Sequence, residues 1–286
     1  MSLEFSIKDL SDDTTVHTEA LKRSYNTAAE VEQAIGNIAI QKAQRQWYDN
    51  LMNGFMAGAF VALIGTFAYT AGGGLDPAFN KAFPSVQKII FSGCFASALL
   101  FIVLFGGDLF TGNIMVMFVG VIQRKCTILK LLENWVLVTI GNAAGALLTT
   151  YLFAYLTHQF EAEPWLSWII GNAEKKVSYS FGVAFLKAIP ANAFVCFAVY
   201  LALTARDITG KFICFWWPVF AFAMCGYEHS IANLFYIPVG MMYGAKVTVG
   251  QFIVNNFIPV VLGNIVGGAG LVGLTSYVLN PKKKQL

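Results

Sequence analysis

The stretch GYEHSIAN (Gly226–Asn233) places charged side chains inside one of the most apolar parts of the chain. It follows the sequence FICFWWPVFAFAMC and is followed by LFYIPVGMM. Glu228 and His229 are the only Asp, Glu, His, Lys or Arg residues between Lys211 and Lys246. Because ionisable side chains are costly to keep in an apolar segment, this pair indicates a functional site.

The overall composition is that of a membrane protein. Of 286 residues, 57% are hydrophobic and 12% are charged, whereas a soluble globular protein carries roughly 25% charged residues. The apolar residues also occur in long blocks, which predicts a membrane-embedded chain. The net charge of +3 is too small to indicate a nucleic-acid partner. The five cysteines show no paired spacing, so the sequence predicts neither a metal centre nor a cofactor.

Long apolar segments predict six membrane-spanning helices, because a bilayer requires about 20 apolar residues per span. The expected spans cover residues 51–71, 88–122, 131–156, 181–205, 212–243 and 253–279. The second and the fifth exceed thirty residues, and each has a polar break in its middle. These breaks are GGDLFTGN (Gly106–Asn113) and GYEHSIAN, so both helices are expected to be interrupted within the membrane.

The two breaks belong to an internal repeat. Both follow the pattern G-x-[Asp/Glu]-x4-N, and each is followed by an asparagine, a Gly-Asn pair and a further glycine. The matching positions are Gly106, Asp108, Asn113, Asn134, Gly141, Asn142 and Gly145 in the first half, and Gly226, Glu228, Asn233, Asn256, Gly263, Asn264 and Gly267 in the second. The offset between the halves is 120–122 residues. Three spans per half is an odd number, so the halves must lie in opposite orientations.

This repeat predicts the fold class, an all-α membrane protein with six transmembrane helices in an inverted 3+3 repeat. Broken helices at corresponding positions, here the second and the fifth, indicate a transport path where the two halves meet. The alternative is that two glycine-rich helix kinks resemble each other by chance, since glycine is common in spanning helices.

Basic residues predict the orientation of the chain. With the N-terminus in the cytoplasm, thirteen of the nineteen Lys and Arg residues fall in cytoplasmic tails and loops, as the positive-inside rule requires. We therefore expect a cytoplasmic N-terminal segment (1–50), a transmembrane channel domain (51–279) and a cytoplasmic basic tail (280–286). Residues 27–47 predict an amphipathic helix that begins with a capping box of Thr27 and Glu30. Such a helix serves either as an interfacial anchor or as a gate.

Residues in and near the breaks predict what the path does. Interrupted backbone at this depth survives only beside protein or water, and free amides at helix N-termini attract anions. His229 is therefore expected to bind an anion or to supply it with a proton. Asp108 and Glu228 either hold loose backbone amides or take part in transport. Lys187, the only basic residue of the fourth span, either draws anions into the path or snorkels to the outer interface.

At these motifs the chain resembles the formate/nitrite transporter family, which also includes hydrosulfide channels. The resemblance covers about residues 27–279. Its most specific parts are GGDLFTGN, ANAFVCFAVY (191–200), GYEHSIAN and NNFIPVVLGNIVGG (255–268). The resemblance implies an aquaporin-like fold, six spans per protomer, a homopentamer with one pore in each protomer, and a place in the cell membrane.

The resemblance also implies which residues line the pore. The substrate or pore positions implied are Thr111, Lys187, Asn192, Glu228, His229 and Asn233. The outer constriction corresponds to Phe95, Val195 and Phe222, and the inner constriction corresponds to Leu99, Leu109 and Phe110. Lys187 and the short connection 244–252 resemble the nitrite-type and hydrosulfide-type branches, whereas the constrictions resemble the formate type. The choice among formate, nitrite and hydrosulfide therefore stays open at this point.

The sequence thus predicts a channel or transporter for small monovalent anions of weak acids, and not an enzyme. The two apolar constrictions that the resemblance implies would exclude a bare anion, whereas a proton from His229, or from water relayed past it, would neutralise the solute. The main alternative is an aquaporin-type channel for water or small neutral solutes, although neither break contains the paired Asn-Pro-Ala signature. An intramembrane enzyme using His229 and Glu228 would need a nucleophile–base set that the sequence does not show. An ammonium conduit would need a second pore histidine.

Overall fold

The computed structural model describes residues 23–280, which are helical apart from short connections and one isolated β-bridge between Tyr25 and Ala205. In chain order the helices are α2 (Ala28–Gln44), α3 (Trp47–Gly73), α4 (Pro77–Ala82), α5 (Pro84–Phe95), α6 (Ala98–Leu104), α7 (Phe110–Ile122), α8 (Ile128–Thr150), the π-helical turn η1 (Tyr151–Tyr155), α9 (Trp165–Val177), α10 (Phe181–Thr204), α11 (Ile208–Cys225), α12 (Ser230–Met242), α13 (Val249–Gln251), η2 (Phe252–Phe257), α14 (Ile258–Ile265), η3 (Val266–Leu274) and α15 (Thr275–Leu279). Residues 1–22 of the expected N-terminal segment and 281–286 of the expected basic tail lie outside the described residues.

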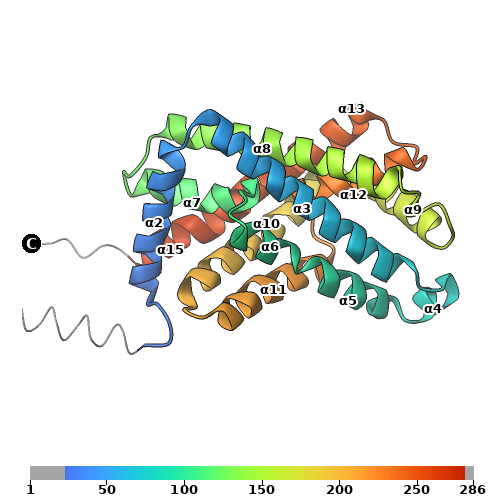
Figure 1. The fold of residues 1–286 in the computed structure, drawn as a ribbon, viewed down its shortest axis with the longest axis horizontal. Helices are drawn as coiled ribbons and strands as arrows, with labels where there is room; N and C mark the ends of the chain where they lie inside the picture. The colour runs from blue at the N-terminus through green and yellow to red at the C-terminus, as the bar shows by residue number, and fades with distance from the viewer. Residues whose placement is uncertain (1–22, 281–286) are drawn as a thin grey trace, which may run out of the picture.

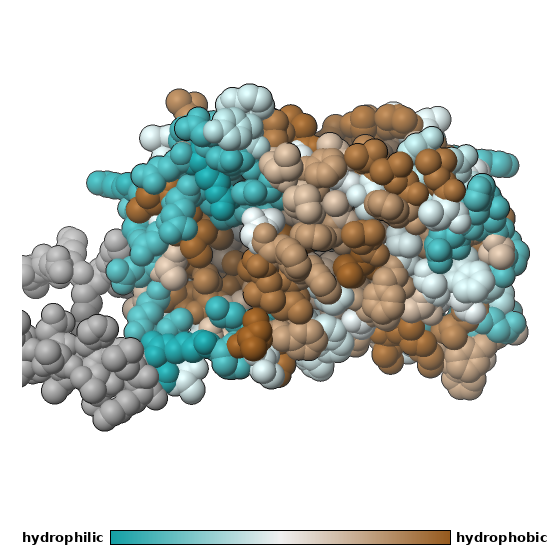
Figure 2. Space-filling model, viewed as in Figure 1, coloured by the Kyte–Doolittle hydropathy of each residue, from teal (hydrophilic) through white to brown (hydrophobic). Residues whose placement is uncertain are grey.

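Six helical segments of the described chain are long and apolar enough to cross a membrane. They are Trp47–Gly73, Pro84–Leu104, Ile128–Tyr155, Phe181–Thr204, Ile208–Cys225 and Val249–Leu279. In Figure 2 an apolar band separates two more hydrophilic ends of the molecule, as expected for a protein that spans a bilayer. The prediction of six spans in an all-α membrane protein is confirmed.

Both expected breaks are present, and both are shorter than the polar motifs that marked them. The first lies between α6 and α7, and the second lies between α11 and α12. Each begins near a glycine with positive φ, +77° at Gly106 and +65° at Gly226, a backbone conformation that glycine adopts without steric cost. The helices resume at Phe110 and Ser230, so Asn113 lies on a helix rather than in the break. The half-helices α7 and α12 have 13 residues each, too few to span a bilayer of about 30 Å.

The two halves pack in the same way around close-packed glycines. In the first half α8 lies against α3, and in the second the segment from α14 to η3 lies against α10. A Cβ atom on Gly145 would lie 1.9 Å from the carbonyl oxygen of Phe55, and one on Gly267 would lie 2.1 Å from that of Ile189. Side chains at these positions would therefore force the helices apart, as expected for glycine-mediated packing within a membrane.

The described chain begins and ends at the same side of the bundle. In Figure 1, α2 and α15 lie at the left end, whereas α4 and α9 lie at the right end. The amphipathic helix α2 begins at the expected capping box and buries Val31 and Ile35 against α7. Helix α9 was not predicted from the sequence, because its 13 residues are too short and too polar to resemble a span. It packs on α12, which brings it beside the second break.

Candidate functional site

Two cavities of similar size approach the breaks from opposite ends of the bundle. The first, about 380 Å³, lies on the α9 side and is lined by residues of α5, α9 and α10 and by Gly226 to His229; we call it the Lys187 vestibule. The second, about 390 Å³, lies on the α2 side and is lined by residues of α2, α6, α7 and α11 and by Gly106 to Leu109; we call it the Lys42 vestibule. A path between them would have to pass the buried residues where the two half-helices meet.

The fold joins the two breaks through one side-chain pair. The Nε2 atom of His229 lies 2.9 Å from the Oγ1 atom of Thr111, the second residue of α7, and both side chains are buried. The other ring nitrogen, Nδ1, accepts a hydrogen bond of 3.0 Å from the backbone N–H of Ala232. In a neutral ring the hydrogen must therefore sit on Nε2, which donates to Thr111. The hydroxyl hydrogen of Thr111 is then free to be donated to a third group.

A buried asparagine holds the backbone of the first break. The side-chain oxygen of Asn142 on α8 accepts from the N–H of Phe110 at 3.0 Å, which satisfies one of the free amides at the start of α7. Its amide nitrogen donates to the carbonyl oxygens of Gly54 and Asp108, each at 2.8 Å. One side chain therefore ties together α3, the break and α7.

The corresponding asparagine of the second half holds the backbone of the second break in the same way. Asn264 on α14 accepts from the N–H of Ser230 at 2.9 Å. Its amide nitrogen donates to the carbonyl oxygens of Ala188, at 2.8 Å, and Glu228, at 3.1 Å. The sequence pattern marked both asparagines as repeated positions, and the structure shows that each of them fixes a break.

The two carboxylates are buried beside the breaks and paired with cations. Glu228 forms an ion pair of 3.0 Å with Lys176 of α9, and it accepts from the side chains of Asn233 at 2.7 Å and Asn256 at 3.2 Å. Asp108 forms ion pairs with Lys42 and Arg45, both near the C-terminal end of α2. A paired charge is far less costly to bury than an isolated one.

Sequence reasoning missed these three cations. Lys42 and Arg45 belong to the segment that was expected to be cytoplasmic, and Lys176 stands in the run EKK between two expected spans. Nothing in the local sequence connects them to carboxylates 52 to 66 residues away. The only signal in the sequence was that the carboxylates stand within apolar segments. A carboxylate in such a place needs a counter-charge, but the sequence does not identify the residue that supplies it.

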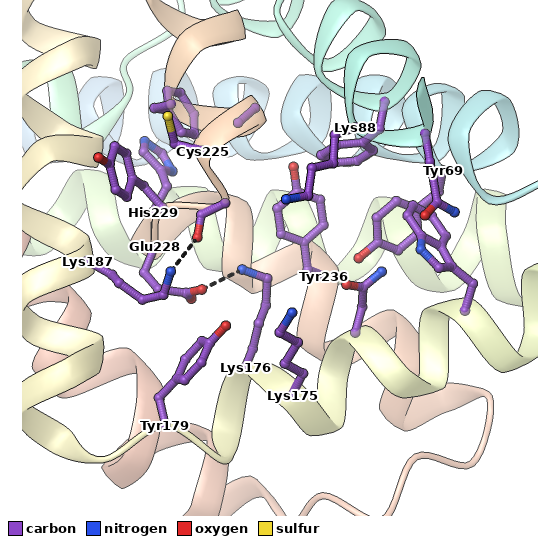
Figure 3. Close-up of a pocket in the computed structure, with 18 residues that line it drawn as sticks. Tyr69, Lys88, Lys175, Lys176, Tyr179, Lys187, Cys225, Glu228, His229 and Tyr236 are labelled. Atoms are coloured by element: carbon purple, nitrogen blue, oxygen red, sulfur yellow. Dashed lines mark hydrogen bonds and ion pairs between the residues drawn. The ribbon is translucent and has the colours of Figure 1, made fainter. Parts of the chain in front are cut away.

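The side chain of Lys187 is part of the vestibule wall. Its ammonium group donates to the carbonyl oxygen of Gly226 at 3.1 Å and lies 5.3 Å from the ring centre of Tyr179. Figure 3 shows it beside Glu228 and His229, with Lys176 on the adjacent helix. The position of Lys187 places a cation at the entrance to the second break.

The two predicted pore asparagines lie in different surroundings. Asn233 is fully buried on α12 and donates to Glu228 and to the side chain of Asn256. Asn192 is fully buried between α10 and α14, where it donates to the carbonyl oxygen of Asn264 at 2.7 Å. Neither asparagine lines a vestibule. Asn192 therefore supports the residue that holds the break.

The six predicted constriction residues belong to one buried apolar cluster. They are Phe95, Leu99, Leu109, Phe110, Val195 and Phe222. Phe222 lines the Lys187 vestibule, stacks on His229 at 5.5 Å between ring centres and meets the edge of Phe95 at 6.4 Å. Leu99 and Leu109 line the Lys42 vestibule. The His229–Thr111 pair is thus embedded among apolar side chains between two cation-lined cavities.

Comparison with known sequences identifies the family. Residues 29–278 match the profile of a family described as "Formate/nitrite transporter". The chain belongs to this family. The similarity covers the whole region in which the two breaks, the two vestibules and the repeat lie.

Individual relatives of this family extend the comparison. The chain is 37% identical over 260 residues to a "Probable formate transporter" of Methanothermobacter thermautotrophicus, covering 86% of this chain and 94% of that protein. A solved structure called "FNT family ion channel" is 25% identical, with a TM-score of 0.80 over 88% of this chain and 99% of that one. A second, "Pentameric formate channel with formate bound", is 28% identical, with a TM-score of 0.68 over 82% of this chain and 97% of that one.

Membership of the formate/nitrite transporter family confirms the predicted family and fold, and it makes the chain a multi-pass membrane transport protein. The family consists of transporters and channels, so the prediction that the chain is not an enzyme is confirmed as well. The aquaporin alternative is not favoured, because the relatives and the solved structures are transporters and channels of the formate/nitrite family. Within residues 23–280, no cluster of three or more His, Cys, Asp or Glu side chains is arranged to hold a metal ion.

Proposed function

We propose that this family member conducts small monovalent anions of weak acids, in the class of formate, nitrite and hydrosulfide, between the two vestibules. The observation that carries the proposal is the His229–Thr111 pair, which joins the two breaks in an apolar surrounding between cation-lined cavities. A formate channel with formate bound has the same fold, which supports a small carboxylate as solute.

The electrostatics favour a solute that changes its charge on the way. A bare anion loses its hydration among Phe95, Val195 and Phe222, whereas the neutral acid loses much less. Lysine ammonium groups raise the concentration of anions at the entrance. The solute then meets a hydroxyl group at Thr111 that is free to donate a hydrogen bond and is oriented by His229. A proton carried by water past the Thr111 hydroxyl neutralises the anion, and the acid crosses the apolar stretch.

The remaining site residues have supporting roles in this proposal. Lys187 attracts the anion at the mouth of the second break. Glu228 neutralises Lys176 and, with Asn233, keeps the start of α12 in place. Asn192 acts through Asn264 and sets the position of the break. None of these roles requires a cofactor.

We further propose a homopentamer with one path in each protomer. The support is a pentameric channel of the same fold, together with many large apolar side chains exposed on the outside of the single chain. The cell membrane is the proposed location, with both termini in the cytoplasm, because the α2 side carries the basic loops. In this arrangement residues 1–50 form a cytoplasmic segment, 51–279 the channel and 280–286 a cytoplasmic tail, and α2 anchors or gates the inner mouth.

The test is uptake of labelled formate, nitrite and hydrosulfide into proteoliposomes at several pH values. Lys187→Ala is expected to raise the half-saturation concentration, because it removes a cation from the mouth. His229→Asn is expected to change the pH dependence of uptake, because asparagine can cap α12 but cannot orient the Thr111 hydroxyl past which the proton moves. Lys81→Ala, on α4 outside both vestibules, is the matched control and should behave as the parent. Equal kinetics for all variants, or no uptake of any anion, would refute the proposal.

A further inference from the structure

The Lys187 vestibule carries more positive charge than the protein itself neutralises. Four lysines line it, namely Lys88, Lys175, Lys176 and Lys187. Glu228 is the only carboxylate among its lining residues, and it is paired with Lys176. The ion pairs formed by residues 23–280 include none for the other three lysines. Three ammonium groups therefore face one cavity without a protein counter-charge.

The three uncompensated lysines come from different walls of the cavity. Lys88 lies on α5, Lys175 on α9 and Lys187 on α10, and Figure 3 shows them around the same space. On α9, residues 168, 172, 175 and 176 all line the cavity, which is the spacing of one helix face. A concave site with cations on several sides can hold an anion by more than one of its oxygen atoms.

The lining also offers hydrogen-bond donors for the remaining oxygen atoms. The phenol groups of Tyr69 and Tyr236 line the vestibule, and so does the amide of Asn172. The cavity of about 380 Å³ has room for a molecule several times larger than formate. Its size and charge therefore exceed what a small monovalent ion requires.

The exit from the vestibule discriminates strongly by charge. The route towards the opposite vestibule meets Phe222, Phe95 and Val195, all at most 4% exposed. A dicarboxylate must lose the hydration of two carboxylate groups rather than one, so entering such a surrounding costs it roughly twice as much as it costs a monocarboxylate. A dianion also needs two protons, rather than one, to become neutral.

We propose that the Lys187 vestibule is a binding site for small dicarboxylate dianions, which occupy it without crossing and so block the path. The inference rests on the proposed function for the block itself, whereas binding does not require transport. Lys88 and Lys175 supply the second positive region that a dicarboxylate needs and a monocarboxylate does not.

The opposite vestibule is not expected to bind dianions in this way. Both Lys42 and Arg45 form ion pairs with Asp108, which leaves Lys211 as the other lysine lining that cavity. Lys211 therefore provides a matched control, because it is also a vestibule lysine but has no second cation free beside it.

The experiment measures inhibition of labelled formate uptake by succinate at neutral pH, with succinate on both faces of the membrane so that protein orientation does not matter. Monomethyl succinate, similar in size but with one charge, is the ligand control. Succinate is expected to inhibit competitively and at least about tenfold more strongly than its monoester. Labelled succinate itself should not enter. Uptake of labelled succinate, or equal inhibition by the monoester, would overturn the proposal.

Variants assign the block to the lysines. The double variant Lys88→Gln/Lys175→Gln should raise the inhibition constant for succinate about tenfold or more, while the half-saturation for formate changes less than about threefold. Lys211→Gln should leave the inhibition constant for succinate unchanged. Added monovalent salt should weaken the binding of succinate more than the binding of formate, because salt screens both carboxylates of succinate. Equal losses in the double variant and in Lys211→Gln would contradict the assignment.

A binding measurement separates this inference from the proposed function. Succinate should raise the thermal unfolding midpoint of the detergent-purified protein, and the double variant should lose that shift. A shift without formate uptake would refute the proposed function and leave the binding site in place. Formate uptake with neither a shift nor inhibition would refute the site alone.

Discussion

The two broken helices share a scaffold but carry different chemistry. Each break begins near a glycine with positive φ and ends at an extended residue that precedes the half-helix. That last residue is Leu109 in the first half and His229 in the second. The asparagines that hold the breaks match almost atom for atom. The comparison shows that the interrupted backbone is duplicated, whereas the imidazole of His229 is present only in the second break and pairs with Thr111 from the first half.

The carboxylates differ in a related way. Glu228 takes one cation and two asparagine side chains, all from the membrane-embedded bundle or from α9. Asp108 takes two cations from α2, which lies outside the repeated spans. The carboxylate of the second break is thus held by α9 and by asparagines of the bundle, whereas the carboxylate of the first break is held by the N-terminal helix α2.

The largest effect is expected from removing either scaffold asparagine. Asn142→Leu and Asn264→Leu each abolish three hydrogen bonds and leave buried backbone groups unsatisfied, at a cost of about 3 kcal/mol or more. Both should lower the yield of folded protein and its thermal midpoint by similar amounts. Asn172→Leu, at a half-buried vestibule position, should have little effect. Unequal losses of folded yield or thermal midpoint would show that the two asparagines do not have equivalent roles.

The next largest effect concerns the group that the halves share. Thr111→Val keeps the shape of the side chain but leaves the Nε2–H of His229 without an acceptor, so initial uptake rates should fall about tenfold or more. Thr111→Ser retains the hydroxyl group and should retain most of the activity. Full activity of the valine variant would mean that the pair has no role in transport.

The carboxylates should produce a smaller and local difference. Asp108→Asn leaves Lys42 and Arg45 without their counter-charge, so backbone amides of α2 should exchange hydrogen roughly tenfold faster. Glu228→Gln should leave α2 unaffected and should instead speed exchange near Lys176 at the end of α9. Exchange measured by mass spectrometry after digestion resolves the two helices. The same pattern in both variants would show that the breaks are held in the same way.

The smallest effect is a difference in pH dependence between two capping boxes. They are Thr27–Glu30 at α2 and Thr248–Gln251 at α13. Hydrogen bonds from the backbone N–H and the hydroxyl of Thr27 hold the pKa of the Glu30 carboxyl below its usual value. The contribution of Glu30 is therefore present above the pKa of the unfolded chain and is lost as the pH falls through the lower folded-state pKa. Gln251 does not titrate, so acid should speed amide exchange at the start of α2 but not at α13. Glu30→Gln should remove the pH dependence.

Much of the scaffold was predictable from local pattern. The G-x-[Asp/Glu]-x4-N motif located both breaks because a glycine, a carboxylate and an asparagine are what an interrupted helix needs there. Gly145 and Gly267 were visible in the sequence as repeated positions, although only the structure shows which backbone of the neighbouring helix packs against each of them. The inverted repeat followed from the number of spans per half.

The partners that complete the site were not predictable in the same way. Lys176 reaches Glu228 only because α9 folds back on α12, and no spacing within the sequence records that contact. Asn192 was expected to line the pore because its motif resembles the family, yet its side chain is directed at Asn264 because of how α10 and α14 pack. Contacts between distant segments depend on tertiary packing, which periodicity does not encode.

The hydrogen bond from Ala232 to His229 has a consequence for the electrical character of transport. An imidazolium ion has no lone pair on Nδ1, so charging the ring would take the cap away from α12 and leave a buried amide unmatched. The imidazole of His229 is thereby kept neutral. The negative charge of the anion must therefore be neutralised by a proton that binds to the solute itself. Under the proposed function each passage then moves no net charge, and the gradient of the acid, rather than the membrane voltage, sets the direction of flow.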